Sequence, residues 1–258
     1  QADGGYTLSI KLIQRQQGPA YELQLPIEVR LQGDKNIHRK TIRLTSKDDV
    51  ITLYFNKPPQ ALTIDPGFDV FRLLQDDERP ASLGRLFGAK KQLLVMPAEA
   101  SKAQMQAWKK LAESWSSRYK NVTLAFDKEI ESVPEDASLW ILGWNNALLK
   151  DRQHHFTIRY PVSATETFSQ SLSGNKASID RQQLDAEKHA VVLLDADSNR
   201  TAQGFIGAQD PEVIASLARK LPHYSSYGQL VFKLPEVKNI IKQRLPALNS
   251  PMTWKSGQ

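Results

Sequence analysis

Apolar and polar residues alternate along the first third of the chain. In the stretch YELQLPIEVRLQ every second residue is apolar, while polar side chains occupy most positions between them. A period of two residues is typical of a β-strand that is buried on one face only. The apolar positions are Leu23, Leu25, Ile27, Val29 and Leu31. Pro26 falls on the opposite face, and because proline has no N–H to donate, we expect this strand at an edge or with a bulge.

The same alternation recurs in YTLSIKLIQ, RKTIRLTS and DVITLYFNKP. The separators QQGPA, QGDKN, SKDD and NKPPQ supply the Gly, Pro, Asp and Asn residues that turns require. Several short strands at this spacing predict a small antiparallel sandwich. We therefore predict an all-β, immunoglobulin-like sandwich domain over residues 1–78.

The pattern changes after residue 90, where short apolar runs alternate with helical periodicity. KQLLVM, NVTLAF, SLWIL, AVVLL and GQLVF are typical of buried strands. Ser101 followed by Gln104 matches a capping box and predicts the start of a helix. Asp210 and Pro211 predict the N-cap and first residue of another helix. This alternation predicts an α/β domain over residues 90–258 with a mostly parallel sheet.

Two segments interrupt the order of strands and helices. Residues 79–89 carry Pro80, Gly84 and Gly88 and are predicted to connect the two domains. Residues 153–185 contain HHFTIRY and a Ser/Gln-rich piece, which we interpret as an added hairpin or a mobile insertion.

Composition excludes several kinds of site. The chain has no cysteine, which excludes disulfides, thiolate zinc sites and cysteine nucleophiles. Its five histidines form no H-E-x-x-H, and no G-x-S-x-G, G-x-G-x-x-G or G-x-x-x-x-G-K-[ST] motif is present. His154 and His155 are adjacent and on a strand would point to opposite faces, so they would not share a metal. We therefore expect no catalytic residue, no metal site and no cofactor in this chain.

Two loops after predicted strands carry polar residues. Asp195 and Asp197 follow AVVLL, and Asn145 follows SLWIL. Loops at the carboxyl ends of parallel strands are where α/β sheets bind ligands, so these three side chains are candidate ligand-binding residues. The alternative is that they cap turns and helices, as Asp and Asn commonly do.

The stretch RKLPHYSSYGQLVF adds His223 and Tyr224 to the candidate ligand-binding residues. His223 has no acid partner or nucleophile within this motif, and a histidine needs such neighbours to act as a general base. We therefore interpret His223, Tyr224 and Tyr227 as residues that pack the last helix against the last strand. They would bind a ligand only if a pocket lies beside them.

Positive charge is concentrated in the last part of the sequence. Residues 219–258 hold seven basic residues and one acidic residue, Glu236, which accounts for the whole net charge of +6. Aromatic residues are not interleaved with arginine there, so we expect no nucleic-acid binding and only a weak contact with anionic surfaces. No apolar run approaches the roughly 20 residues of a membrane span, and we expect no signal peptide.

The line LTIDPGFDVFRLLQDDERPASLGRLFG, residues 62–88, resembles the stretch that follows the catalytic domain in a bacterial branch of the gluzincin zinc aminopeptidases, the membrane alanyl aminopeptidase-like family. The similarity is carried by Ile64, Asp65, Pro66, Asp69, Val70, Phe71, Arg72, Leu73, Glu78, Pro80 and Leu83. YELQLPIEVRL is similar to a strand that precedes it in that family. LWILGWNN, GFIGAQDPEVIASLARKLPHYSSYGQLVF and ALNSPM resemble an α/β module that follows it.

This resemblance implies a C-terminal, non-catalytic region in which a β-sandwich is followed by an α/β module. The family's H-E-x-x-H zinc site and its G-x-M-E-N motif have no counterpart here, so zinc is expected only in an upstream catalytic domain. That domain of the same parent chain is the expected partner, with a peptide or protein as a further ligand. The region would support the catalytic domain and dock a substrate or partner, in the periplasm or at the cell envelope.

Two other functions stay open at this point. One is an independent hydrolase with its site at the strand ends, which requires the polar loop residues after SLWIL and AVVLL to converge around a pocket. The other is a glycan- or protein-binding module that uses exposed rings of Trp144, Trp254 or Tyr224 as stacking platforms.

Overall fold

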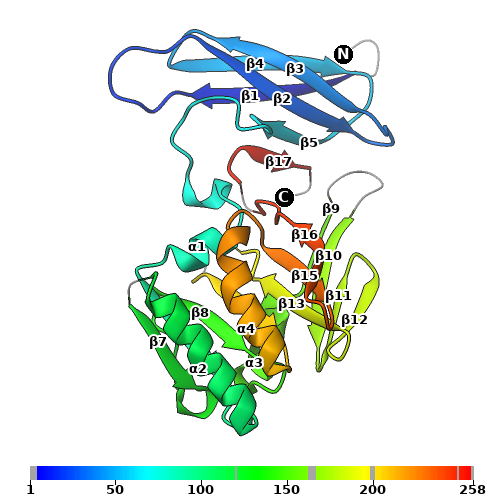
Figure 1. The fold of residues 1–258 in the computed structure, drawn as a ribbon. Coiled ribbons are helices and arrows are strands. Elements are labelled where there is room, and N and C mark those ends of the chain that lie inside the picture. Colours follow the sequence, from blue (N-terminus) through cyan, green and yellow to red (C-terminus); the bar gives the residue numbers. More distant parts are fainter. Residues whose placement is uncertain (1–4, 120, 162–166, 198–200, 249, 257–258) are drawn as a thin grey trace. The chain divides into compact units, whose positions relative to one another are not determined.

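A computed structural model describes residues 5–119, 121–161, 167–197, 201–248 and 250–256 of the 258-residue chain. Backbone contacts divide the chain into two compact units, whose elements are labelled in Figure 1. Unit 1 comprises residues 1–78 together with 249–258, and unit 2 comprises residues 79–248. Both units are rich in β-strands. None of the described helices is long and apolar enough to cross a membrane.

Unit 1 contains two antiparallel sheets that share one core. The smaller sheet pairs β1 (Tyr6–Ile13) with β4 (Asp48–Phe55), and the larger has the order β17-β5-β2-β3. The strands of the larger sheet are β2 (Leu23–Leu31), β3 (Ile37–Leu44), β5 (Pro59–Ile64) and β17 (Thr253–Lys255). The alternation predicted for β2 is confirmed, because its apolar residues from Leu25 to Leu31 are buried in the shared core. β17 pairs with β5, so a segment that we assigned to the α/β domain from its sequence contributes a strand to unit 1.

β2 lies inside the larger sheet and not at its edge, because it pairs with β3 on one side and with β5 on the other. Pro26 is tolerated there because β5 ends at Ile64 and the chain turns away at Asp65. The missing N–H of Pro26 therefore coincides with the end of the ladder, and its carbonyl accepts a hydrogen bond from Asp65 N at 2.8 Å. A bulge does occur in this strand, between Arg30 and Leu31.

Unit 2 is built on a seven-stranded sheet with the order β16-β15-β13-β14-β8-β6-β7. Its strands are β6 (Lys91–Met96), β7 (Val122–Phe126), β8 (Ala137–Leu142), β13 (His189–Leu194), β14 (Gln203–Gly207), β15 (Gln229–Lys233) and β16 (Lys238–Gln243). The sheet is mixed, whereas the sequence predicted a mostly parallel one. β7, β6, β8 and β14 are parallel neighbours, while β13, β15 and β16 join by antiparallel pairing. Two connections, 195–202 and 234–237, cause this, because each is shorter than the dozen or so residues of a parallel crossover.

β14 lies in the middle of this sheet although no sequence pattern predicted it. Its sequence, QGFIG, has only five residues, two of them glycine, which is too short to display an alternation. Both glycines are required by close packing. A Cβ at Gly204 would lie 2.9 Å from Leu86 Cδ1, and a Cβ at Gly207 would lie 2.5 Å from the ring of Trp144.

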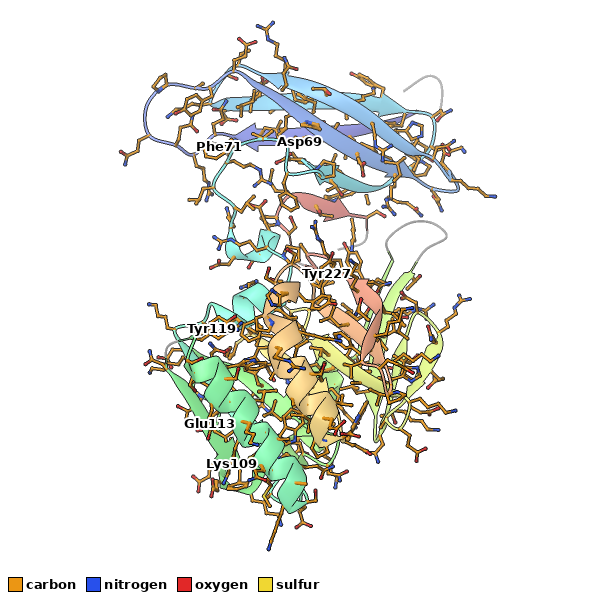
Figure 2. All side chains as sticks on the ribbon, in the orientation of Figure 1. Asp69, Phe71, Lys109, Glu113, Tyr119 and Tyr227 are labelled. Atoms are coloured by element: carbon orange, nitrogen blue, oxygen red, sulfur yellow. The ribbon has the colours of Figure 1, made fainter. Side chains whose placement is uncertain are left out.

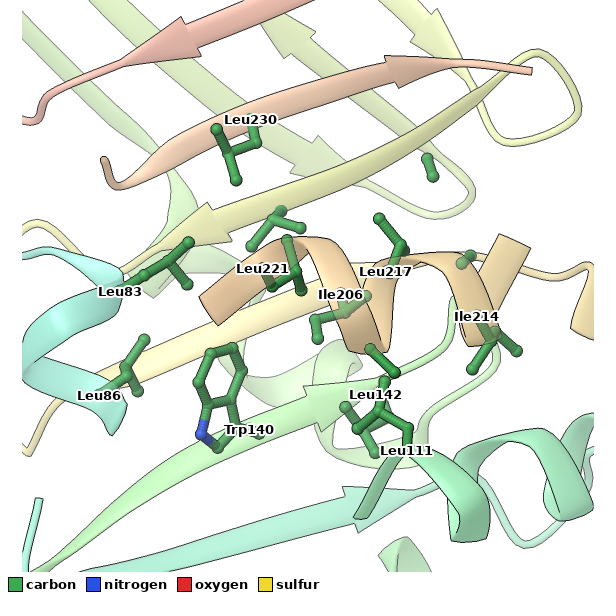
Figure 3. Packing of buried hydrophobic residues seen from close by; sticks show 14 of the residues in the cluster. Leu83, Leu86, Leu111, Trp140, Leu142, Ile206, Ile214, Leu217, Leu221 and Leu230 are labelled. Carbon is green, nitrogen blue, oxygen red and sulfur yellow. The ribbon is translucent and has the colours of Figure 1, made fainter. Parts of the chain in front are cut away.

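Three helices cover one face of the seven-stranded sheet. They are α1 (Leu83–Phe87), α2 (Lys102–Ser116) and α4 (Pro211–Lys220). Figure 3 shows their leucines packed against Trp140, Leu142 and Ile206 of the central strands. The same cluster buries Trp108 and Trp115 of α2, so the tryptophans of this helix belong to the core.

The helix starts predicted from the sequence are confirmed. Ser101 Oγ accepts a hydrogen bond from Gln104 N, and Gln104 Oε1 accepts one from Ser101 N, which completes the capping box of α2. Asp210 is the N-cap of α4, and its Oδ1 accepts a hydrogen bond from Glu212 N at 2.7 Å. Pro211 is the first residue of that helix, where its missing N–H costs nothing.

A second sheet, with the order β12-β11-β10-β9, packs against the opposite face of the seven-stranded sheet. Its strands are β9 (Ile158–Pro161), β10 (Thr167–Ser173), β11 (Lys176–Ile179) and β12 (Gln182–Asp185). Leu172, Ile179 and Leu184 are buried against Val191 and Phe205. The segment that we interpreted as an added hairpin or mobile insertion is therefore one wall of a core. α3 (Ala147–Arg152) and the 3-10 helix η3 (Gln153–Phe156) complete this face.

Truncation of one leucine tests whether this second sheet is a structural wall. We expect Leu184→Ala to destabilise unit 2 by about 2–5 kcal/mol, because Leu184 is fully buried and its removal leaves a cavity. The control is Gln183→Ala, on the exposed face of the same strand, which should change the free energy of unfolding by less than about 0.5 kcal/mol. Equal, small effects in urea unfolding would show that the sheet does not contribute to the core.

Candidate functional site

A buried carboxylate and a histidine lie close together at one end of the strands of the seven-stranded sheet. Asp195 directly follows β13, and its Oδ2 lies 3.2 Å from Nδ1 of His155 in η3. Its other oxygen, Oδ1, accepts a hydrogen bond from Asp197 N at 3.0 Å. His155 lies in a 3-10 helix and not on a strand. Its ring contacts that of His154 in a tilted arrangement, with centroids 4.1 Å apart and an interplanar angle of 35°.

The surroundings of Asp195 leave little space for a substrate. Ser82, Arg85, Asp195, Asp197 and Gln203, with nearby apolar residues, line a recess of about 10 Å³. A volume of this size holds one water molecule. Ser82 lines the recess, and within the described residues no hydrogen bond joins it to His155.

Asn145 does not join Asp195 and Asp197, because the strands that carry them point in opposite directions. β13 is antiparallel to β14, and β14 is parallel to β8, so the end of β13 lies beside the beginning of β8. Asn145 follows the end of β8 and therefore lies at the opposite end of the strands. Six residues of strand separate the two ends, which at roughly 3.3 Å per residue is about 20 Å. This is not the convergence that an independent hydrolase site requires.

The remaining predicted residues lie in and beside the 3-10 helix η4 (Leu221–Tyr224). Tyr224 makes an edge-to-face contact with Phe232 of β15 at 5.8 Å and with Tyr227 at 6.0 Å. The two tyrosines thus pack the end of α4 onto the strand, while His223 is exposed. Of the rings considered as stacking platforms, Trp144 is buried, whereas Trp254 of unit 1 is 41% exposed.

Within the part of the chain that the structure describes, no group of three or more Asp, Glu or His residues lies close enough together to hold a metal ion.

The segment after β5 contains a polar network centred on Asp65 and Arg72. Asp65 is fully buried and has a positive φ of 52°, a conformation that a non-glycine residue adopts only when its surroundings hold it. Its Oδ1 accepts hydrogen bonds from the backbone of Asp69 at 2.7 Å and of Val70 at 3.2 Å. Arg72 Nε donates to Asp65 Oδ2 at 2.9 Å, and Arg72 Nη1 lies 2.5 Å from Glu78 Oε2.

Arg72 therefore bridges two buried carboxylates and closes the segment into a compact loop. Glu78, in the 3-10 helix η1 (Asp76–Glu78), also accepts a hydrogen bond from Gln75 N through Oε1. From the sequence, these residues supported only the family resemblance and were assigned no role. Their partners lie three to seven positions apart and follow no helical or strand period.

Large apolar side chains project outward from this same loop. Phe71 is fully exposed, Leu73 is 91% exposed and Phe68 is 49% exposed. Figure 2 labels Phe71 and Asp69 on the loop that follows β5. We call residues 65–73 the docking segment. Beside it lies an open hollow of about 590 Å³ on the surface of β2 and β3. It is lined by Pro26, Ile27, Glu28, Arg39, Lys40, Thr41, Pro66, Gly67 and Asp69.

Comparison with protein-family models and with curated proteins found no match to this chain.

Replacing Arg72 tests the network that holds the docking segment. We expect Arg72→Met to speed amide exchange at Asp69 and Val70 about 100-fold, because the change leaves two buried carboxylates without their cation. The control is Arg39→Met, which removes an ion pair with Glu28 from a side chain that is 72% exposed, and it should change these rates less than about fivefold. Similar rates in the two variants would contradict a stabilising role for Arg72.

Proposed function

We propose that the chain is a non-catalytic accessory region that docks onto a protein partner through residues 65–73. The observation that carries the proposal is the full exposure of Phe71 and near-full exposure of Leu73 on a loop fixed by the Asp65–Arg72–Glu78 network. Exposed apolar side chains that stand singly are normal, but a cluster on an ordered loop marks a surface for interaction.

The energetics favour a protein partner. Removing a Phe or Leu side chain from water is worth about 1.5–3 kcal/mol. Because the network already fixes the backbone, little ordering would be required on binding. The hollow beside the segment carries both signs of charge, with Glu28 and Asp69 against Arg39 and Lys40. An apolar anchor with a mixed polar rim is the usual anatomy of a protein–protein interface.

The residues that carry the family resemblance separate into two groups. Asp65, Arg72 and Glu78 have partners within the loop, so the fold alone explains them. Phe71 and Leu73 contribute nothing to the core, and a partner surface would explain them. On this basis we propose that the partner is an upstream zinc aminopeptidase-like catalytic domain of the same parent chain, acting in the periplasm or at the cell envelope. In this proposal, unit 1 is an immunoglobulin-like sandwich that carries the docking segment, and unit 2 is an α/β domain.

The proposal predicts that the chain alone has no peptidase activity. We expect the purified chain to show no turnover of aminoacyl-amide substrates and no tight zinc binding by calorimetry, because catalysis is assigned to the upstream domain. Turnover that scales with protein concentration and is lost in Asp195→Asn would instead support a hydrolase site at the Asp195–His155 pair. The coding sequence upstream of residue 1 should contain H-E-x-x-H, and its absence would remove the proposed partner.

Polar substitution of the docking segment should weaken binding to that partner. We expect Phe71→Ser combined with Leu73→Ser to raise the dissociation constant for the separately expressed catalytic domain at least about 100-fold, since two anchors are lost. Tyr54→Ser is the matched control. Tyr54 is another exposed aromatic residue of unit 1, with 76% of its surface accessible, but it lies on β4. This substitution should have little effect on the dissociation constant. Equal affinity of the double variant and the unchanged chain, measured by calorimetry, would refute the role of the segment.

A further inference from the structure

The seven-stranded sheet of unit 2 ends on one side in the edge strand β7. This strand pairs with β6, and no described strand pairs with its other side. Figure 1 shows β7 as the outermost strand of the sheet. A strand with an unpaired side presents a row of backbone N–H and C=O groups to which another strand can add. The residues of the strand determine whether such pairing is hindered.

Among the edge strands of the described sheets, β7 is the one that contains neither a charged residue nor a proline. Its sequence is VTLAF. Charged side chains and proline hinder pairing at an edge, because pairing would bury the charge and proline has no N–H to donate. Every other described edge strand holds at least one charged residue, so β7 lacks the protection that the chain has at its other edges. These residues are Lys11 in β1, Asp48 in β4, Lys40 in β3, Lys255 in β17, Asp185 in β12, Arg159 in β9 and Lys238 in β16.

The bonds between β6 and β7 determine which backbone groups of β7 face outward. Gln92 N of β6 donates to Asn121 O at 2.9 Å, and Gln92 is in register with Val122. In a parallel ladder this register directs the N–H and C=O groups of Thr123 and Ala125 toward β6. The backbone groups of the alternate residues therefore point away from the sheet.

Val122 and Leu124 are thus open for pairing on the outer side of β7. Phe126 also faces outward, but its N–H donates to Glu129 Oε2 at 3.1 Å, which leaves only its C=O open. Thr123 is exposed and the other residues of the strand are partly exposed, whereas every residue of β8 in the middle of the sheet is buried. The outer side of β7 is therefore accessible to solvent.

A second copy of β7 fits this edge when the two strands run antiparallel. A twofold axis at Leu124 places the two Leu124 residues opposite each other and places Val122 of each copy opposite Phe126 of the other. Leu124 N–H then donates to Leu124 C=O of the other copy, and Val122 N–H donates to Phe126 C=O. All three side chains pack against the apolar cluster that includes α2, so they share one face and form apolar cross-strand pairs.

Charges at the two ends of β7 also favour an antiparallel copy. The exposed Arg118 precedes the strand, and the exposed Glu129 and Glu131 follow it. Antiparallel pairing brings the beginning of one strand beside the end of the other, so opposite charges come together at both ends of the interface. The opposite edge of the same sheet differs, because β16 carries Lys238 and Lys242, which would repel those of a second copy.

We propose that two copies of the chain associate through β7 into a symmetric dimer with one continuous sheet. Stable interfaces bury about 1,200–2,000 Å² in total, and a pair of five-residue strands supplies only part of this area. The dimer is therefore reversible, and its fraction depends on protein concentration. This interface is independent of the docking segment, because β7 belongs to unit 2.

Sedimentation and amide exchange of the whole chain test this proposal. From micromolar to millimolar concentration, we expect the average mass to rise from 29.1 kDa toward twice that value. Over the same range, exchange of Leu124 N–H should slow at least about tenfold, while Ala125 N–H, already bonded to β6, should not change. A monomer at every concentration would overturn the proposal and leave this edge for a strand of a different protein. A dimer without protection at Leu124 would overturn it equally.

A lysine on the edge provides the matched variant. Thr123→Lys changes an exposed side chain of β7 and should raise the dissociation constant of the dimer at least about tenfold, because a charge on an edge strand hinders pairing. The control is Thr52→Lys, the same change at an exposed position of β4 in unit 1, which should leave the dissociation constant unchanged. Slow exchange of Ala125 N–H in Thr123→Lys would show that β7 still pairs with β6. Equal dissociation constants for the two variants would contradict the proposal.

Discussion

The reversal of chain direction between β13 and β14 places Asp195 and Asn145 at opposite ends of the strands in the seven-stranded sheet. The connection of residues 195–202 is too short for a parallel crossover, so β13 must run against the central parallel strands. Its end, with Asp195, therefore lies at the edge where β8 and β14 begin. Helix starts and the ends of β6, β8 and β14 gather at the other edge, beside Asn145. The two recesses lined by described residues, one with Asp195 and one with Asn145, each have a volume of about 10 Å³.

A different constraint governs unit 1. Burying Arg72 between Asp65 and Glu78 contributes little apolar packing, and buried ion pairs commonly stabilise a fold no better than apolar residues would. What the network does is determine one conformation for a loop that has no regular secondary structure between β5 and η1. In that conformation Phe71 and Leu73 face solvent. A protein–protein interface needs exposed apolar residues that are held in a fixed shape. The ionic network fixes the shape of this loop, and in this way it supports the proposed docking function.

Patterns in the sequence predicted the elements that are determined by interactions between neighbouring residues. The period of two in β2 and the caps Ser101 and Asp210 could be read directly, because each rests on neighbours within a few residues. β14 could not, since its five residues owe their position to strands distant in sequence. The Asp195–His155 pair was also missed. It joins segments 40 positions apart, and finding it requires the second sheet, whose short strands lack a strong apolar pattern.

In the proposed function, an upstream catalytic domain covers Phe71 and Leu73. Hydroxyl-radical footprinting of the chain alone and of the chain joined to that domain measures this most directly, because oxidation reports the solvent exposure of individual side chains. The proposed docking predicts that Phe71 and Leu73 are oxidised readily in the chain alone and are protected at least about tenfold in the joined protein, while Tyr54 reacts equally in both. Equal oxidation of Phe71 and Leu73 in the two forms would contradict it.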